Sequence, residues 1–227
     1  MDGTWTGVRE RVLVLREAPG RSEVFGAESP RGGGHGFELL PVLTEAEVRA
    51  VERSLAVELP AEYRSFLLEV GAGGAGPDYG LFPLRPPGPD TPPSPEPPFR
   101  PELTAELESG EPERDDYADE AAFLAAYQLW DARADELHDA LTDGTLCIGE
   151  RGCAYYNLLV INGPHLGTVW EDVRAVGEGV VPIRLAGETG PVPFARWYLN
   201  WLHHAERRAW DTAAGTPPRP RPTDGAA

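Results

Sequence analysis

Apolar residues recur three or four positions apart in five segments of the chain, the spacing typical of a helix with one buried face. The first segment ends near Pro19, the second begins at a capping box formed by Thr44 and Glu47, and Pro60 and Pro193 precede the third and the fifth. We therefore predict five helices. Their apolar positions are Val8, Val12 and Leu15; Val48, Val51 and Leu55; Tyr63, Phe66, Leu67 and Val70; Phe123, Tyr127, Trp130, Ala134, Leu137 and Leu141; and Phe194, Trp197, Tyr198, Trp201 and Leu202.

Four shorter segments predict strands: 79–84, 145–149, 154–161 and 168–171. The third is apolar on both faces except at Asn157, which indicates a central strand that is covered on both sides. Helices come first, then strands, then a final helix. This order favours an α+β fold, a single domain with a mixed, mainly antiparallel β-sheet flanked by helices.

Glycine and proline gather in three stretches, 26–36, 83–101 and 211–227. Proline at the density of the second stretch excludes helix interiors and central strands, so this stretch is either a domain boundary or a long loop. We predict an N-terminal helix and flexible connector over 1–36, one domain over 37–210, and a disordered tail over 211–227.

Charge narrows the possible partners. The chain has 20 Lys and Arg against 37 Asp and Glu, a net charge of −17. Like-charged phosphates would be repelled, which argues against nucleic acid or a membrane surface as the partner. Two cysteines form no disulfide framework, and neither a signal peptide nor a long apolar segment is visible, so we expect a cytoplasmic protein.

The acidic residues are concentrated in 102–120, where nine carboxylates accompany one base, Arg114. Such a run is either a solvated loop or an arm for a basic partner. A second candidate surface is a predicted strand end, where an aromatic ring beside two acids suits an edge anchor or a recognition spot for a cation. The candidate partner-binding residues are Glu106, Glu108, Glu111, Glu113, Asp115 and Asp116 in the run, and Trp170, Glu171 and Asp172 at the strand end.

The sequence offers little support for catalysis. The glycine-rich segment 71–80 follows a helix and precedes a strand, the wrong order for a phosphate-binding loop. Cys147 and Cys153 have no further ligands at metal-site spacing, and we expect them to be buried free thiols that pack as small apolar groups. We predict no cofactor and no metal. A nucleophilic Cys153 stays open as a lesser alternative.

Three stretches together resemble the SUKH superfamily, which joins fungal cell-wall synthesis regulators with bacterial toxin-immunity proteins. They are 43–84, 148–172 and the final helix. The residues that carry the resemblance are Glu52, Leu55, Leu59, Pro60, Tyr63, Phe66, Leu67, Gly73, Gly74, Gly76, Pro77, Tyr79, Gly80 and Leu81; Gly152, Cys153, Leu159, Val160, Gly163, Gly167, Val169 and Trp170; and Phe194, Trp197, Tyr198, Trp201 and Leu202.

The resemblance implies one domain in which residues from about 85 to 118 are an insertion. It also implies a binding protein without catalytic residues. We expect an immunity or antitoxin protein that neutralises a basic toxin, such as a nuclease, by binding it. The alternative is a regulatory adaptor or scaffold like the cell-wall regulators. The third hypothesis is a hydrolytic enzyme that uses Cys153 or clustered acids.

Overall fold

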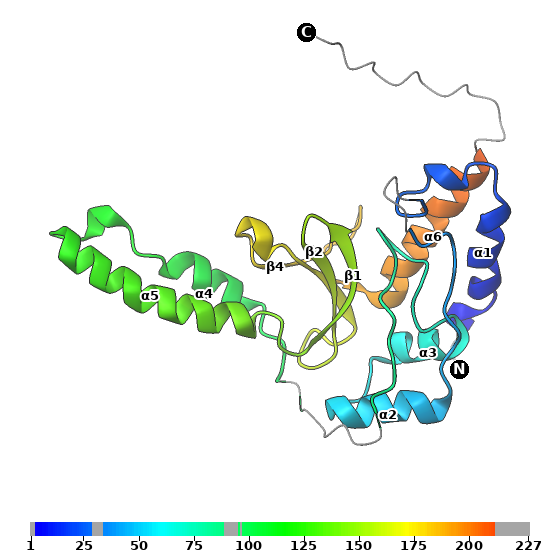
Figure 1. The fold of residues 1–227 in the computed structure, drawn as a ribbon, viewed down its shortest axis with the longest axis horizontal. Helices are drawn as coiled ribbons and strands as arrows, with labels where there is room; N and C mark the ends of the chain where they lie inside the picture. Colours follow the sequence, from blue (N-terminus) through cyan, green and yellow to red (C-terminus); the bar gives the residue numbers. More distant parts are fainter. Residues whose placement is uncertain (1–2, 29–33, 89–94, 96, 212–227) are drawn as a thin grey trace, which may run out of the picture.

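The structure, a computed structural model, describes residues 3–28, 34–88, 95 and 97–211. It contains an antiparallel sheet and six α-helices, which confirms the α+β class (Figure 1). The expected tail at 211–227, except for Asp211 at the end of the last helix, and parts of the first two glycine- and proline-rich stretches lie outside the described residues. The helices are α1 (Val8–Val14), α2 (Glu45–Leu55), α3 (Ala61–Glu69), α4 (Glu102–Gly110), α5 (Glu120–Ala140) and α6 (Phe194–Asp211), and the strands are β1 (Thr145–Gly152), β2 (Tyr155–Val160), β3 (Thr168–Asp172), β4 (Val180–Pro182) and β5 (Val192–Pro193).

The sheet has the order β1-β2-β3-β4, with β5 paired to the other end of β3. Every pairing among the described strands is antiparallel. Cys153 and Ala154 form the turn between β1 and β2 with φ values of 56° and 62°, so β1 is longer than predicted. Segment 79–84 is not a strand, because only Leu81 makes isolated bridges, to Gly74 and Gly149.

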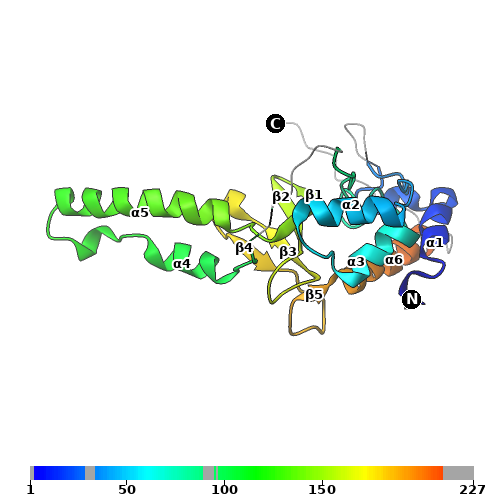
Figure 2. The same cartoon turned by 90° about the horizontal axis from the view of Figure 1, so that it is seen from below.

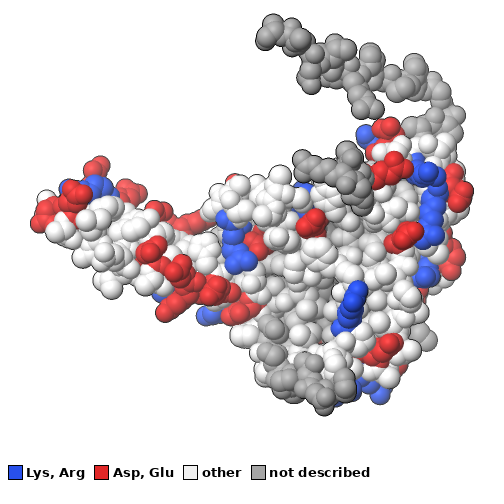
Figure 3. All heavy atoms as spheres, viewed as in Figure 1, with Lys and Arg blue, Asp and Glu red and all other residues white. Residues whose placement is uncertain are grey.

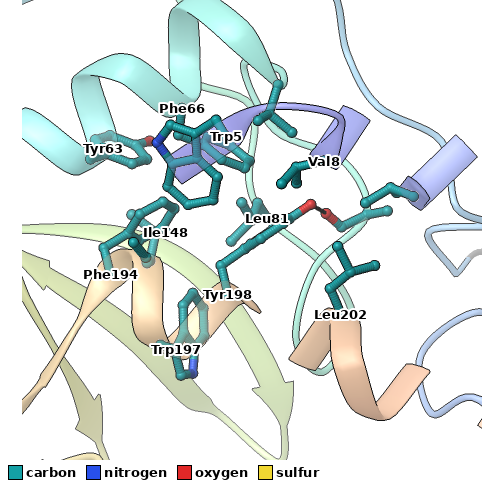
Figure 4. Close-up of a cluster of buried hydrophobic side chains, with 14 of the residues drawn as sticks. Trp5, Val8, Tyr63, Phe66, Leu81, Ile148, Phe194, Trp197, Tyr198 and Leu202 are labelled. Atoms are coloured by element: carbon teal, nitrogen blue, oxygen red, sulfur yellow. Dashed lines mark hydrogen bonds between the residues drawn. The ribbon is translucent and has the colours of Figure 1, made fainter. Parts of the chain in front are cut away.

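The main core fills the space between one face of the sheet and helices α1, α3 and α6 (Figure 4). Trp5 lies at its centre, with its ring 5.1 Å from Phe66 and 5.9 Å from Tyr198, in edge-on contacts. Val8 and Val12 of α1 are also buried there. The N-terminal segment therefore packs as part of the domain, and residue 36 does not separate two packing units.

Local hydrogen bonds fix the helices that hold this core. The predicted capping box at α2 is present, with Thr44 and Glu47 exchanging both bonds. Glu62 of α3 accepts a hydrogen bond from the backbone N–H of Ala195 at 3.0 Å, which satisfies one free donor at the start of α6. Tyr198 donates its hydroxyl proton to the Ala75 carbonyl at 2.8 Å. These bonds orient α6 across the sheet.

The opposite face of the sheet carries a second, smaller apolar cluster, which includes Leu158, Trp170 and Phe99. Helices α4 and α5 pack on each other and extend away from the sheet as a two-helix arm (Figures 1 and 2). We call residues 102–140 the arm. The interpretation of 102–120 as a solvated loop is wrong for 102–110, which form α4. The protruding part continues through α5, beyond the expected insertion at 85–118.

Candidate functional site

Most of the net negative charge of the protein lies on the arm. Thirteen of the 37 carboxylates fall between residues 102 and 140, together with only two arginines, Arg114 and Arg133. The arm therefore contributes −11 to the net charge of −17. Figure 3 shows acidic side chains along the arm, separated by uncharged surface. This arrangement gives the arm a negative potential that attracts basic proteins.

All six acids predicted from the run are exposed on the arm. Glu106 and Glu108 lie on α4, whereas Asp115 and Asp116 belong to the short turn of 3-10 helix at Arg114–Asp116. Glu106 accepts a charged hydrogen bond from Arg133 of α5 at 2.9 Å. The other five have no ion pair within 4.0 Å in the described part of the chain, so they can pair with basic groups of a partner.

The arm also carries an uncharged face, on α5. Leu124 and Leu129 are 49% and 76% exposed, and they occur at helical spacing with four further exposed, uncharged residues. We call this set the α5 stripe: Ala121, Leu124, Ala125, Gln128, Leu129 and Ala132. The sequence analysis missed it, although the spacing of three and four was visible, because the opposite face of α5 has the larger aromatic residues.

Polar contacts fix the base of the arm to the sheet. Arg174, after β3, donates to the carbonyl oxygen of His138 of α5 at 2.7 Å and forms a two-bond ion pair with Asp172. The hydrogen bonds that Arg174 donates to the Asp172 carboxylate are the main reason that the pKa of Arg174 is raised. The hydroxyl of Thr104 in α4 accepts a hydrogen bond from the backbone N–H of Val180 at 3.2 Å and donates one to its carbonyl oxygen at 3.3 Å. The arm is thus held at each of its two helices.

The predicted strand-end group is divided between the two faces of the sheet. Trp170 is 5% exposed and packs 5.0 Å from the Phe99 ring in the second cluster, so it is a core residue and not a surface anchor. Asp172 is also 5% exposed and is occupied by Arg174. Glu171, between them, points to the opposite face because side chains alternate along a strand.

Glu171 belongs to an open cleft of about 830 Å³ between the sheet, α6 and the two loops 22–28 and 77–79. Arg151 pairs with both Glu171 and Asp78, at 2.5 and 3.5 Å. Asn157 is fully buried and donates from Nδ2 to Asp78 at 3.1 Å. Aromatic side chains, including Trp197 of α6, also line this cleft. Sequence reasoning found only Glu171 of this site.

The described residues contain no group of three or more potential ligands that could hold a metal ion. No helix among them combines the length and apolar character needed to span a bilayer. Cys147 and Cys153 are free thiols, but both are exposed, so the expectation that they are buried is wrong. Cys153 lies in the β1–β2 turn with a φ of 56°. The site regions of this structure are an exposed acidic arm and an open cleft.

The fold and these surfaces define an α+β domain with an acidic helical arm and an open cleft. The chain belongs to the SMI1/KNR4 family (SUKH-1), whose model matches residues 42–178, more than half of the chain. The match confirms the superfamily resemblance. Members of this family are generally binding proteins without enzymatic activity. No curated protein matches the chain. No solved structure matches it either.

The family match includes α2, α3, the arm and the first three strands. Helices α1 and α6 lie outside the matched residues but complete the same hydrophobic core. The final helix, which contributed to the resemblance, is therefore joined to the family region by packing.

Proposed function

We propose that this protein is a cytoplasmic immunity or antitoxin protein, which neutralises a basic toxin such as a nuclease by binding it with the arm. The observation that carries the proposal is the combination on one protrusion of 13 carboxylates and the exposed α5 stripe. Charge alone would steer a basic partner toward the arm, and the stripe supplies apolar area that a specific complex can bury.

The geometry favours a protein as the partner over a small molecule. The arm extends away from the body (Figure 2), and it offers two kinds of surface, exposed carboxylates and the α5 stripe. A nuclease needs a basic cleft to hold phosphate, and an acidic protrusion is complementary to such a cleft in shape and charge. Binding there would cover the catalytic cleft of the toxin.

The alternative function is a regulatory adaptor or scaffold related to the cell-wall regulators. The family match is compatible with both functions. An adaptor would use the same arm for cellular proteins that are not toxic. The two functions differ in the behaviour of the partner, which an experiment can measure directly.

The first experiment captures partners from native lysate with the tagged full chain, at low and then moderate salt. We expect one basic protein that is released as the salt rises, because screening weakens exposed charge pairs. Expressed alone, this protein should stop growth, and co-expression of the full chain should restore growth. Release of several non-toxic proteins would favour the adaptor.

The second experiment assigns the surface with purified partner. The double substitution Glu108→Gln and Glu113→Gln should slow association and reduce its salt dependence. Its control is the double substitution Glu58→Gln and Glu178→Gln, which removes equal charge outside the arm. In the stripe, Leu129→Ser should weaken binding about tenfold, about 1.4 kcal/mol.

The matched control for Leu129→Ser is Leu166→Ser, which changes a leucine that is 53% exposed outside the arm. All four positions carrying the charge substitutions, and both leucines, are exposed, so the fold should be retained in each variant. Equal affinities for the arm variants and their controls would refute the arm as the binding surface.

A further inference from the structure

The cleft contains an acceptor atom that the protein itself leaves unused. Asn157 is 0% exposed, and its Oδ1 has no hydrogen-bond partner in the described structure. The orientation of this amide is fixed by Asp78, whose carboxylate can only accept and therefore requires the Nδ2 donor on its side. The carboxylate of Asp78 therefore leaves the amide oxygen of Asn157 without a partner.

The charges around Asn157 are also unbalanced. Asp78 and Glu171 share one arginine, Arg151, and the Asp78 contact of 3.5 Å is longer than a good charged hydrogen bond. The side chains of both acids are 22% exposed, so they remain accessible from the cleft. This corner of the cleft has a surplus of negative charge and of acceptors. An anionic ligand would meet two carboxylates and an amide oxygen.

Aromatic groups form the walls around these acceptors. Phe25 and Tyr79 make a tilted pair with ring centroids 5.2 Å apart, and Trp197 and Trp201 line the side formed by α6. Flat aromatic surfaces beside carboxylates suit a delocalised cation, which can stack on a ring while its N–H groups bond to oxygens.

The approach of the two loops that carry Phe25 and Tyr79 is built into the backbone. A Cβ at Gly26, whose φ is +77°, would lie 1.6 Å from the carbonyl oxygen of Asp78, so this position requires glycine. Asp78 itself has a φ of 55°, a conformation that aspartate and asparagine tolerate better than most residues. The cleft is therefore a fixed feature of the fold.

We infer that the cleft between the sheet, α6 and loops 22–28 and 77–79 binds an arginine side chain presented by the protein partner. The guanidinium donates to the accessible carboxylates of Asp78 and Glu171, next to the buried amide of Asn157, and its plane packs between the aromatic walls. This inference deepens the proposed function, on which it rests for the identity of the partner as a protein. It adds a specific pocket, separate from the arm.

The test uses the full chain labelled with ¹⁵N and two small probes, N-acetyl-arginine N-methylamide and the corresponding citrulline compound. Citrulline has nearly the same shape but no charge. We expect the arginine probe to shift the side-chain amide signal of Asn157 and the indole signal of Trp201 in a saturable way. Each signal is identified by its loss in Asn157→Ala or Trp201→Phe. The citrulline probe should bind at least about tenfold more weakly, because hydrogen bonds to a charged group are lost.

Substitutions locate the binding within the cleft. Asp78→Asn retains the side-chain shape and suits the backbone conformation, and it should weaken the arginine probe about tenfold. Glu136→Gln, an equal charge change on the arm, should leave the affinity within about twofold, because that exposed charge is screened. Thermal unfolding checks that each variant is folded, and Glu171→Gln replaces Asp78→Asn if the latter is not.

Equal responses to the two probes, absence of a saturable shift, or an equal loss of affinity in Glu136→Gln would overturn the inference. The probes need no partner protein, so this result is independent of the arm experiment. Binding of arginine at the cleft with no toxic partner would retain the pocket and refute the immunity function. A toxic partner that the protein neutralises, without binding of the arginine probe at the cleft, would retain the function and refute the pocket.

Discussion

The buried histidine beside the cleft gives a prediction about stability and pH. His35 is 7% exposed, and its Nδ1 accepts a hydrogen bond from the backbone N–H of Phe37 at 3.1 Å. Its ring makes edge-on contacts with Phe37 and Trp201, at 5.0 and 5.7 Å between centroids. Burial lowers the pKa of His35 from 6.5 to about 4, because the charged form is poorly solvated there.

The sign and size of the effect follow from this pKa. Between pH 6.5 and about 4 the unfolded chain is protonated at His35 while the folded protein is not, so unfolding takes up a proton. The stability that the neutral His35 contributes is therefore fully present above pH 6.5, and it is lost as the pH falls through this window. The complete shift of the His35 pKa corresponds to about 3 kcal/mol in the free energy of unfolding, of which about 2 kcal/mol is lost by pH 5.

The assay compares urea unfolding of the wild type and of His35→Asn between pH 7.5 and 5. An asparagine Oδ1 can accept the same backbone hydrogen bond as Nδ1 but does not titrate in this range. We expect the wild type to lose about 2 kcal/mol more than His35→Asn over this interval, which is about 4–8 °C in melting temperature for a chain of this size.

The exposed His204 supplies the control, because His204→Asn removes a histidine without changing the buried one. Its pH dependence should follow that of the wild type. Other groups that titrate below pH 5 contribute equally to all three proteins and cancel in the comparison. The same loss of stability in His35→Asn as in the wild type would refute the assignment of this slope to His35.

Two further substitutions test the packing. Gly26→Ala should lower the free energy of unfolding in urea by more than about 2 kcal/mol. The control is Gly177→Ala, which has a similar φ of +81° but nothing within 4 Å, and it should lose only the backbone strain of about 1–2 kcal/mol. Equal losses in the two variants would contradict the close approach of Gly26 to Asp78. Phe99→Ala removes a ring that is 1% exposed from the second cluster and should cost about 3–5 kcal/mol. Limited proteolysis should then cut the arm before the main core, and simultaneous cleavage of both would show that they unfold together.

The elements predicted from the sequence are those determined by local physics. The helix α2 begins where its capping box places it, because Thr44 and Glu47 satisfy each other within one turn. The alternation of polar and apolar residues is short in β4 and β5, which have three and two residues. Such strands exist because β3 supplies their hydrogen-bond partners, so their sequences alone cannot specify them.

The arm and the cleft show what local patterns leave undetermined. Helix α4 has few large apolar residues, and Leu103 and Leu107 become informative only once α5 packs against them. The cleft unites loop 22–28, loop 77–79, two strands and α6, which are distant in the sequence. Asn157 was recognised as the polar exception in a buried strand, but its meaning depends on Asp78, 79 positions away.

The alternation along β3 decides how substitutions at the predicted strand-end group should be interpreted. Trp170 and Asp172 support the base of the arm, so their replacement disturbs the second cluster and the ion pair between Asp172 and Arg174. Lost binding in such variants would reflect a displaced arm as readily as a lost contact. Glu171 lies on the other face, where its side chain reaches the cleft and contributes nothing to the second cluster. Glu171 is therefore the one member of the group whose substitution reports on binding at the cleft, independently of the arm.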